Sequence, residues 1–266
     1  MRLLVLLLFI SLGATAQRVK VTAHRGASGY APENTFSAIR KALEIGVDRI
    51  EVDVQQTADG EIVCLHDKKL NRTTDTKGKV KKFTYAELQQ VNAHHTFKND
   101  FPNEKIPLLR DVFELMDGAT EFVIEIKAGR SYYPGIEDSV ANMITRYEAE
   151  RWALVHSFND RVLEYLDDHH PNIRLQKLFV SKPIWLPLML DFRLHFASLK
   201  DYDYLEGFGV SKGGVDARLV RKVHEIGKVL HVWTVNKPED IAEMLELGVD
   251  GIISNYPDRV KAQLRR

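Results

Sequence analysis

The chain has 266 residues, of which 44% are hydrophobic and 28% are charged, so it can bury a large core and is neither a disordered nor a collagen-like polymer. Its 37 basic residues balance 37 acidic ones, which excludes a global electrostatic attraction to nucleic acid or to an anionic membrane. A charged ligand must therefore be captured at a local site.

The first predicted element is an N-terminal targeting segment. Arg2 precedes an almost wholly apolar run over residues 3–12, and the small residues Ala14, Thr15 and Ala16 follow. This order is typical of a secretory signal peptide cleaved after residue 16. The apolar run is shorter than the about 20 residues of a membrane-spanning helix, which disfavours the alternative of a retained anchor. We predict a signal peptide over 1–16 and an exported chain, periplasmic or secreted, without a stable membrane span after signal removal.

Cys64 is the single cysteine, so no intrachain disulfide accompanies the predicted export. We interpret it as a small buried hydrophobic residue on a strand.

After residue 17, short β-branched runs alternate with amphipathic helical patterns. The eight predicted strands are 19–24, 49–54, 122–127, 153–157, 175–180, 206–211, 229–235 and 251–255. The six predicted helices are 35–45, 108–116, 136–147, 161–169, 217–226 and 238–247. Glycines end several of these helices just before the next strand, as expected at such junctions. The alternation favours one domain over 17–266, a (β/α)8 TIM-type barrel. The alternative is a doubly wound open sheet, but its glycine-rich dinucleotide fingerprint is absent after the first strand.

Two segments interrupt the alternation. Residues 67–105 are long and polar, and we predict an insertion after the second strand at the barrel mouth, with a lid and a solvated excursion as equal interpretations. Residues 183–196 are unusually apolar. That run is typical of a core-packing helix, and a wall for an acyl chain or a membrane-surface contact is the alternative.

Charged and imidazole side chains gather at the predicted strand ends. Glu51 and Asp53 share one face of their strand because alternate side chains of a strand point the same way, and Glu125 and Lys127 share a face of theirs. In a barrel, these residues lie at the carboxyl ends of adjacent strands, where barrel active sites are built. His24 with Arg25 at the first strand and His66 after the second complete the components of a metal-assisted phosphoryl-transfer site.

Nine short motifs also occur in a specific order. They are His24-Arg25-Gly26, Pro32-Glu33-Asn34-Thr35, Glu51-Val52-Asp53-Val54, His66-Asp67, Arg72-Thr73-Thr74, Ile106-Pro107, Glu125-Ile126-Lys127, Trp233-Thr234-Val235-Asn236 and Gly248-Val249-Asp250-Gly251-Ile252-Ile253. Together they resemble the glycerophosphodiester phosphodiesterase family over essentially the whole chain after the signal peptide. The resemblance implies a (β/α)8 barrel of lipid and glycerol metabolism that hydrolyses glycerophosphodiesters to glycerol 3-phosphate and an alcohol, with a divalent metal as cofactor.

The resemblance implies that Glu51, Asp53 and Glu125 are the metal ligands, which agrees with the shared strand face. Hard carboxylate oxygens suit Ca²⁺ or Mg²⁺, and no cysteine or multi-histidine cluster indicates zinc.

Four further residues receive roles from the same resemblance. His24 and His66 become the catalytic acid/base pair, which is appropriate because imidazole titrates near neutrality. Arg25 and Lys127 are expected to bind the phosphate of the substrate, Arg25 through its two-pronged guanidinium and Lys127 as a point charge.

Other positions receive weaker interpretations. Trp233 is expected to line the glycerol or leaving-group pocket, with core packing as the alternative, and His231 on the same strand face is a weaker candidate. Asn34 is predicted to cap the first helix. Asn255 stands where the family commonly has an acidic residue, and no catalytic role is assigned to it. The remaining histidines considered, at 94, 95, 156, 169 and 170, are interpreted as surface or packing residues.

Two other functions were weighed against this one. A lysophospholipase D-like enzyme would use 183–196 to hold an acyl chain. A non-catalytic phosphoester-binding barrel is disfavoured because both histidines and all three carboxylates are present. Two attacking groups are compatible with this site: the 2-hydroxyl of the substrate, which gives a cyclic phosphate, and a water molecule.

Overall fold

The computed structural model describes residues 18–94, 97, 99–180, 189–190, 196–197 and 199–265. The predicted signal peptide and most of the apolar stretch 183–196 lie outside these residues. Within them, no helix has both the length and the apolar character needed to cross a membrane.

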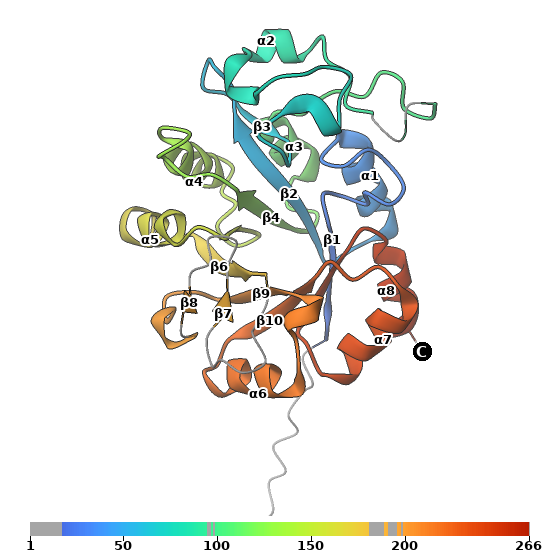
Figure 1. Ribbon diagram of the computed structural model, residues 1–266, viewed down its shortest axis with the longest axis vertical. Coiled ribbons are helices and arrows are strands. Elements are labelled where there is room, and N and C mark those ends of the chain that lie inside the picture. The colour runs from blue at the N-terminus through green and yellow to red at the C-terminus, as the bar shows by residue number, and fades with distance from the viewer. Residues whose placement is uncertain are drawn as a thin grey trace, which may run out of the picture.

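Eight parallel strands of the described chain close into a barrel (Figure 1). They are β1 (Lys20–Ala23), β2 (Arg49–Gln56), β4 (Glu121–Ile126), β5 (Ala153–Ser157), β6 (Arg174–Phe179), β9 (Gly207–Ser211), β10 (Val229–Trp233) and β11 (Gly251–Ser254). Because β1 pairs with both β2 and β11, the sheet has no free edge among these strands. The TIM-type barrel is confirmed, with a strand at each of the eight predicted positions.

Helices surround the outside of this barrel (Figure 1). They are α1 (Phe36–Ile45), α3 (Leu109–Met116), α4 (Ile136–Arg146), α5 (Asp160–His169), α6 (Ala217–Glu225), α7 (Pro238–Glu246) and α8 (Pro257–Leu264). All but α8 were predicted. Gly46 shows how such a helix ends, because its left-handed backbone (φ 72°) lets its N–H donate to the carbonyls of Ala42 and Leu43.

The segment between β2 and α3 contains elements that are not part of the regular alternation of barrel strands and helices. The strand β3 (Ile62–Cys64) pairs antiparallel with β2 and contains the buried Cys64, as expected. The turns η1 (Leu70–Arg72) and η2 (Val80–Lys82) and the short helix α2 (Tyr85–Leu88) follow. Their apolar side chains form a second, smaller hydrophobic cluster with residues of β3 and of 106–108. Its function as a lid stays a prediction.

Shorter elements precede and follow β9. The two-residue strands β7 (Met189–Leu190) and β8 (Phe196–Ala197) pair antiparallel, and the turns η4 (Leu199–Asp201) and η5 (Lys212–Gly214) flank β9.

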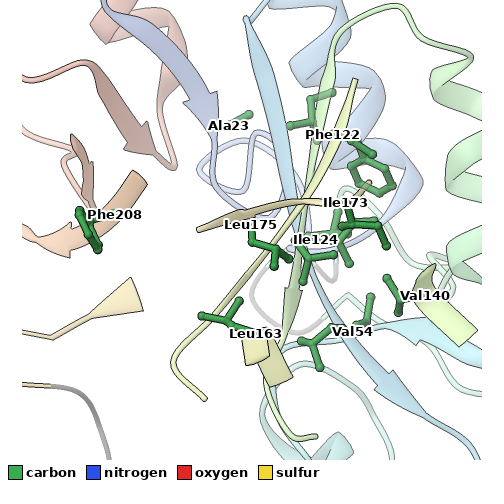
Figure 2. Packing of buried hydrophobic residues seen from close by; sticks show 14 of the residues in the cluster. Ala23, Val54, Phe122, Ile124, Val140, Leu163, Ile173, Leu175 and Phe208 are labelled. Carbon is green, nitrogen blue, oxygen red and sulfur yellow. The ribbon is translucent and has the colours of Figure 1, made fainter. Parts of the chain in front are cut away.

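The main apolar core lies between the barrel and its helices. Ile50, Val52 and Val54 of β2 belong to this cluster, together with Val140 of α4 and Leu163 of α5. Figure 2 shows Val54, Val140 and Leu163 among the packed side chains around β4. The alternate residues of β2 therefore point to the other face, into the barrel interior.

Contacts across the barrel confirm that this interior is polar. Arg49 of β2 donates from Nη1 to His231 Nδ1 of β10 over 3.0 Å, although these two strands are not neighbours in the sheet. Glu51 and Asp53 follow Arg49 on the same face, so strand alternation directs a row of charged groups along the interior toward the carboxyl end.

Candidate active site

A pocket of about 550 Å³, partly open to solvent, lies at the carboxyl ends of the barrel strands. Its lining residues are His24, Arg25, Glu51, His66, Glu125, Lys127, His156, Phe158, Leu178, Trp233, Thr234 and Ile253. This set contains seven of the eight site residues predicted from the sequence, and the eighth, Asp53, is fully buried and bonded to Lys127 of the lining.

Strand register explains why these side chains meet. Asp53 of β2 lies opposite Glu125 of β4, and Glu125 lies opposite His156 of β5. Residues in register on adjacent parallel strands point to the same side of the sheet, so the three side chains form a row across the barrel interior. Glu51 lies two residues before Asp53, on the same face.

Asp53 is held on all sides by donors. Its Oδ1 accepts from Lys127 Nζ at 3.1 Å, and its Oδ2 accepts from Asn34 Nδ2 at 2.8 Å and lies 3.4 Å from Arg25 Nε. Burial alone would raise the pKa of this carboxyl, but Lys127 and Arg25 outweigh burial and hold the pKa well below its usual range. Asp53 is therefore a carboxylate whose charge is balanced by the two cations.

Asn34 has a different role from the one predicted. The cap of α1 is Thr35, whose side chain accepts from the N–H of Ala38. Asn34 instead has a left-handed backbone (φ 59°), donates to Asp53, and accepts from the Asp53 N–H at 3.0 Å. The prediction of an Asn34 cap was wrong because the adjacent threonine takes that position and frees the amide to fix the carboxylate.

The loop after β1 positions Glu51. Arg25 and Gly26 both have left-handed backbones, with φ of 57° and 73°, and this turn directs the Arg25 N–H to Glu51 Oε2 at 2.7 Å. A Cβ at Gly26 would lie 2.6 Å from the backbone of Ala38, so glycine is required there. The other oxygen of this side chain, Glu51 Oε1, is buried without a hydrogen-bond partner among the described residues.

Glu125 and Lys127 form a close pair at the end of β4. Lys127 Nζ donates to Glu125 Oε1 at 2.8 Å as well as to Asp53. Burial raises the pKa of Glu125 and outweighs the opposing effect of Lys127, while the nearby Asp53 raises it further. Burial lowers the pKa of Lys127, but Asp53 and Glu125 outweigh it, so the net shift is upward. The site thus gathers more negative charge than its two cations neutralise.

Glu51, Glu125 and His156 form the metal-competent cluster found among the described residues. One candidate ligand atom from each lies within 4.8 Å of the other two. His156 was interpreted from the sequence as a packing or surface histidine, and its place in this cluster was missed. The available signal was its position near the end of the predicted strand 153–157, which matches the position of Glu125 on the preceding barrel strand.

The two predicted catalytic histidines have different partners. His24 Nδ1 donates to Asn255 Oδ1 at 2.7 Å, and burial, followed by the charge of Arg25, lowers the pKa of His24. His66 Nδ1 lies 2.5 Å from Asp67 Oδ1 and donates to that carboxylate. Both interactions occupy Nδ1, so both rings keep Nε2 for proton exchange.

Ion pairs connect the two histidine loops. Arg25 Nη1 donates to Glu33 at 2.9 Å, and Arg72 donates both to Glu33 at 2.7 Å and to Asp67 at 2.8 Å. Asp67 in turn accepts from His66. Glu33 and Arg72 thereby tie the loop after β1 to the loop that carries His66, so the spacing of the two imidazoles is fixed by charged contacts.

One side of the pocket is apolar. It consists of Phe158, Leu178, Trp233 and Ile253. The rings of Phe158 and Trp233 pack edge to face with centroids 5.5 Å apart. Trp233 lines the pocket, and its contact with glycerol or the leaving group stays a prediction. His231, two residues earlier on β10, is buried and bonded to Arg49 and is not among the lining residues, so the structure does not favour it as a pocket contact.

Comparisons with known proteins agree with this geometry. The model of the "Glycerophosphoryl diester phosphodiesterase family" matches residues 24–259. A glycerophosphodiester phosphodiesterase of Bacillus altitudinis is 41% identical over 90% of this chain and 96% of its own, and one of Caldanaerobacter subterraneus subsp. tengcongensis is 36% identical over 92% and 98%. The structure of an Oleispira antarctica phosphodiesterase in complex with the product sn-glycerol-3-phosphate matches with a TM-score of 0.79 and 26% identity, over 93% of this chain and 97% of that one.

Proposed function

The chain belongs to the glycerophosphoryl diester phosphodiesterase family, and from this premise we propose that it hydrolyses glycerophosphodiesters to glycerol 3-phosphate and an alcohol with a divalent metal ion and two histidines. The observation that carries the proposal is one pocket that brings His24 and His66 to the carboxylates Glu51 and Glu125. The product named for the Oleispira antarctica relative, sn-glycerol-3-phosphate, is the product proposed here.

The residues present fit a divalent cation. Glu51 Oε1 is a buried carboxylate oxygen without a hydrogen-bond partner in the described chain. The three carboxylates, with Asp53 counted behind the lining, outnumber the two nearby cations. Glu51, Asp53 and Glu125 would hold the ion through hard oxygen ligands, consistent with Ca²⁺ or Mg²⁺. When bound, the ion supplies electrostatic stabilisation of charge that develops on the phosphate oxygens.

His24 is proposed as the general base. Its Nδ1 is committed to Asn255, and its lowered pKa keeps the ring neutral near pH 7, so Nε2 can accept a proton from the attacking hydroxyl. His66 is proposed as the general acid, which donates from Nε2 to the leaving alcohol. Its Nδ1–H contact with Asp67 orients the ring in the way that a carboxylate orients the histidine of a hydrolase triad.

Arg25 and Lys127 are proposed to bind the phosphate. Both line the pocket, where Arg25 contacts Asp53 behind the lining and Lys127 contacts Glu125 of the lining. Their positive charges offset the repulsion between the anionic phosphate and the neighbouring carboxylates.

The nucleophile can be identified with a substrate analogue. A 3-hydroxypropyl phosphocholine has the same phosphodiester but lacks the 2-hydroxyl. If that hydroxyl attacks, His24 deprotonates it and the analogue is not hydrolysed, whereas attack by water leaves the analogue as a substrate. Phosphorus NMR of the two reactions distinguishes these routes, because only the first forms a cyclic phosphate.

Substrate class is tested by comparing soluble diesters with a lysolipid. The measurement is kcat/KM for glycerophosphocholine, glycerophosphoethanolamine, glycerophosphoglycerol and lysophosphatidylcholine with protein that starts at Gln17. We expect the soluble diesters to be preferred, because the contacts proposed above are with the phosphate and the metal ion and none of them is with the alcohol. A clear preference for the lysolipid would replace this substrate with that of a lysophospholipase D-like enzyme, since each buried methylene contributes about 0.8 kcal/mol. Binding without product release by any substrate would indicate the phosphoester-binding barrel.

We propose that the chain is exported, and the N-terminal sequence supports this proposal. The basic start, the short apolar run and the small residues before Gln17 have the order of a cleaved signal peptide. Mass spectrometry of the chain recovered from the exported fraction is expected to give a first residue Gln17. A chain that keeps Met1 and remains with the membrane would contradict this proposal.

A further inference from the structure

His156 is a buried histidine that the proposed acid/base chemistry does not use. It lies near the carboxyl end of β5, in register with Glu125, and its exposed fraction is 3%. Its ring faces the pocket that contains Glu51 and Glu125. No packing argument requires an imidazole at this position, because an apolar side chain would fill the same space without burying two polar nitrogens.

Both ring nitrogens of His156 are buried without a hydrogen-bond partner among the residues that the structure describes, and Glu51 Oε1 is in the same condition. Buried polar atoms are nearly always satisfied, because leaving one unpaired costs about 1–3 kcal/mol. Two of these atoms, His156 Nε2 and Glu51 Oε1, face each other at 3.8 Å, which indicates that something else binds between them.

The separation of these atoms fits a shared ion better than a direct contact. His156 Nε2 lies 3.8 Å from Glu51 Oε1, which is too long for a hydrogen bond. Two ligand atoms that bind one ion at about 2.2 Å each are roughly 3–4.4 Å apart, depending on the angle at the ion. Glu125 adds a further oxygen to the same group of atoms.

We propose that His156 is a nitrogen ligand of the ion bound by Glu51 and Glu125, and that this ligand makes the site prefer a first-row transition ion such as Mn²⁺ over Ca²⁺. The inference deepens the proposed function, on which it rests for the use of a divalent ion in this pocket. Ca²⁺ takes oxygen ligands almost exclusively, whereas imidazole is a good ligand for transition ions. The three-carboxylate set expected from the sequence contains no such preference.

The direct test is pulsed electron paramagnetic resonance of the Mn²⁺-loaded full-length mature chain. A histidine nitrogen bound to Mn²⁺ modulates the spin echo, and ¹⁵N-histidine labelling changes that modulation in a recognisable way. We expect nitrogen modulation in the wild type and its loss in His156→Gln, whose amide offers an oxygen of similar reach. The wild-type spectrum needs no variant, so the test stands even if His156→Gln fails to fold.

Calorimetry with Mn²⁺ and Ca²⁺ gives the second readout. His156→Gln should weaken Mn²⁺ binding about tenfold or more. Removal of a residue that only orients a metal ligand already weakens metal binding by about this factor, so removal of a ligand should weaken it at least as much. Ca²⁺ binding should change much less. The matched control is His231→Gln, which replaces an equally buried histidine at the other end of the barrel and should leave both affinities unchanged.

Several outcomes overturn the inference. They are a wild-type Mn²⁺ spectrum without nitrogen modulation, modulation that persists in His156→Gln, and equal Mn²⁺ affinity in that variant and the wild type. The proposed function fails separately: it is contradicted if the Mn²⁺-loaded chain shows the nitrogen ligand but releases no glycerol 3-phosphate from any glycerophosphodiester.

Discussion

The barrel interior contains two groups of charged side chains at opposite ends, and they differ in how their polar atoms are paired. At the amino end, Arg49 Nη2 lies 2.8 Å from Glu121 and 3.3 Å from Glu206. Arg174 pairs with both carboxylates, at 3.3 Å and 2.7 Å. At the carboxyl end, Glu51 Oε1 and both nitrogens of His156 have no hydrogen-bond partner in the described chain, and His156 Nε2 and Glu51 Oε1 lie 3.8 Å apart.

This difference distinguishes a structural ion-pair network from a binding site, although both lie on the same strands. Arg49 and Glu51 both belong to β2, and Glu121 and Glu125 both belong to β4. Buried ions are tolerated when they are paired, so the amino end, where Arg49 has ion-pair partners although its Nε makes no hydrogen bond in the described chain, contributes to the fold. The carboxyl end, with the open acceptor Glu51 Oε1, is arranged for a charged ligand.

The largest expected effect lies at the carboxyl end. Substituting His24→Ala or His66→Ala should lower kcat for glycerophosphocholine by roughly 10²-fold or more, the usual contribution of a general acid or base. Neither residue belongs to the paired network at the amino end, so the melting temperature should change little. Steady-state kinetics and thermal unfolding on the same preparations check both statements. Turnover near the wild-type rate in either variant removes that histidine from the proposed mechanism.

Arg49→Met should show the opposite pattern. Its guanidinium is 1% exposed and contacts Glu121, Glu206 and His231, so its loss should cost about 2–3 kcal/mol in the free energy of unfolding. Arg174 and Lys20 still pair with the carboxylates and limit the loss. Urea denaturation gives the value, with Glu51→Gln as the matched change on the same strand. A larger loss of stability in Glu51→Gln than in Arg49→Met would break the distinction between the two ends.

At the carboxyl end, substitution of the proposed metal ligand Glu125 and of the proposed phosphate contact Lys127 should differ in their effect on metal binding. Glu125→Gln removes a charged oxygen ligand and should weaken divalent metal binding about tenfold or more, whereas Lys127→Ala removes a cation and should not weaken it. Calorimetric titration of each variant measures the two affinities. Equal metal binding in the wild type and in Glu125→Gln would contradict the ligand assignment.

The smallest effect concerns the pH dependence of stability at the amino end. Burial and then Arg49 hold the pKa of His231 well below its usual range, so the folded chain binds fewer protons than the unfolded chain below about pH 6.5. Its stabilising contribution is complete above pH 6.5 and falls as the pH decreases toward the folded pKa. His231→Gln keeps an acceptor for Arg49 but does not titrate. Between pH 7 and 5.5, this variant should therefore lose about 1 kcal/mol less of its free energy of unfolding than the wild type does. Parallel pH curves for the two proteins would show that His231 is not responsible.

The sequence predicted the strands well because each is a short β-branched run bounded by turn residues. Alternation then placed Glu51, Asp53 and Glu125 on interior faces, where the structure shows them. The barrel end was also predictable, since parallel strands all end on one side.

Features that depend on contacts between distant residues were not predictable in the same way. The partner of Asn34 is Asp53 rather than its own helix, and the partner of His231 is Arg49 across the barrel. His156 resembles any buried histidine until strand register places it beside Glu125. The helix α8 has little amphipathic pattern, although Pro257 at its first turn was a usable signal.

The most direct test of the proposed function is metal-dependent release of glycerol 3-phosphate. Protein that starts at Gln17 is treated with a chelator until its metal content is below about one-tenth of an ion per chain, and glycerophosphocholine hydrolysis is followed by phosphorus NMR. The geometry of Glu51, Glu125, His24 and His66 predicts that hydrolysis stops and returns when a divalent ion is added back. A chelated chain that keeps its full rate would contradict the account.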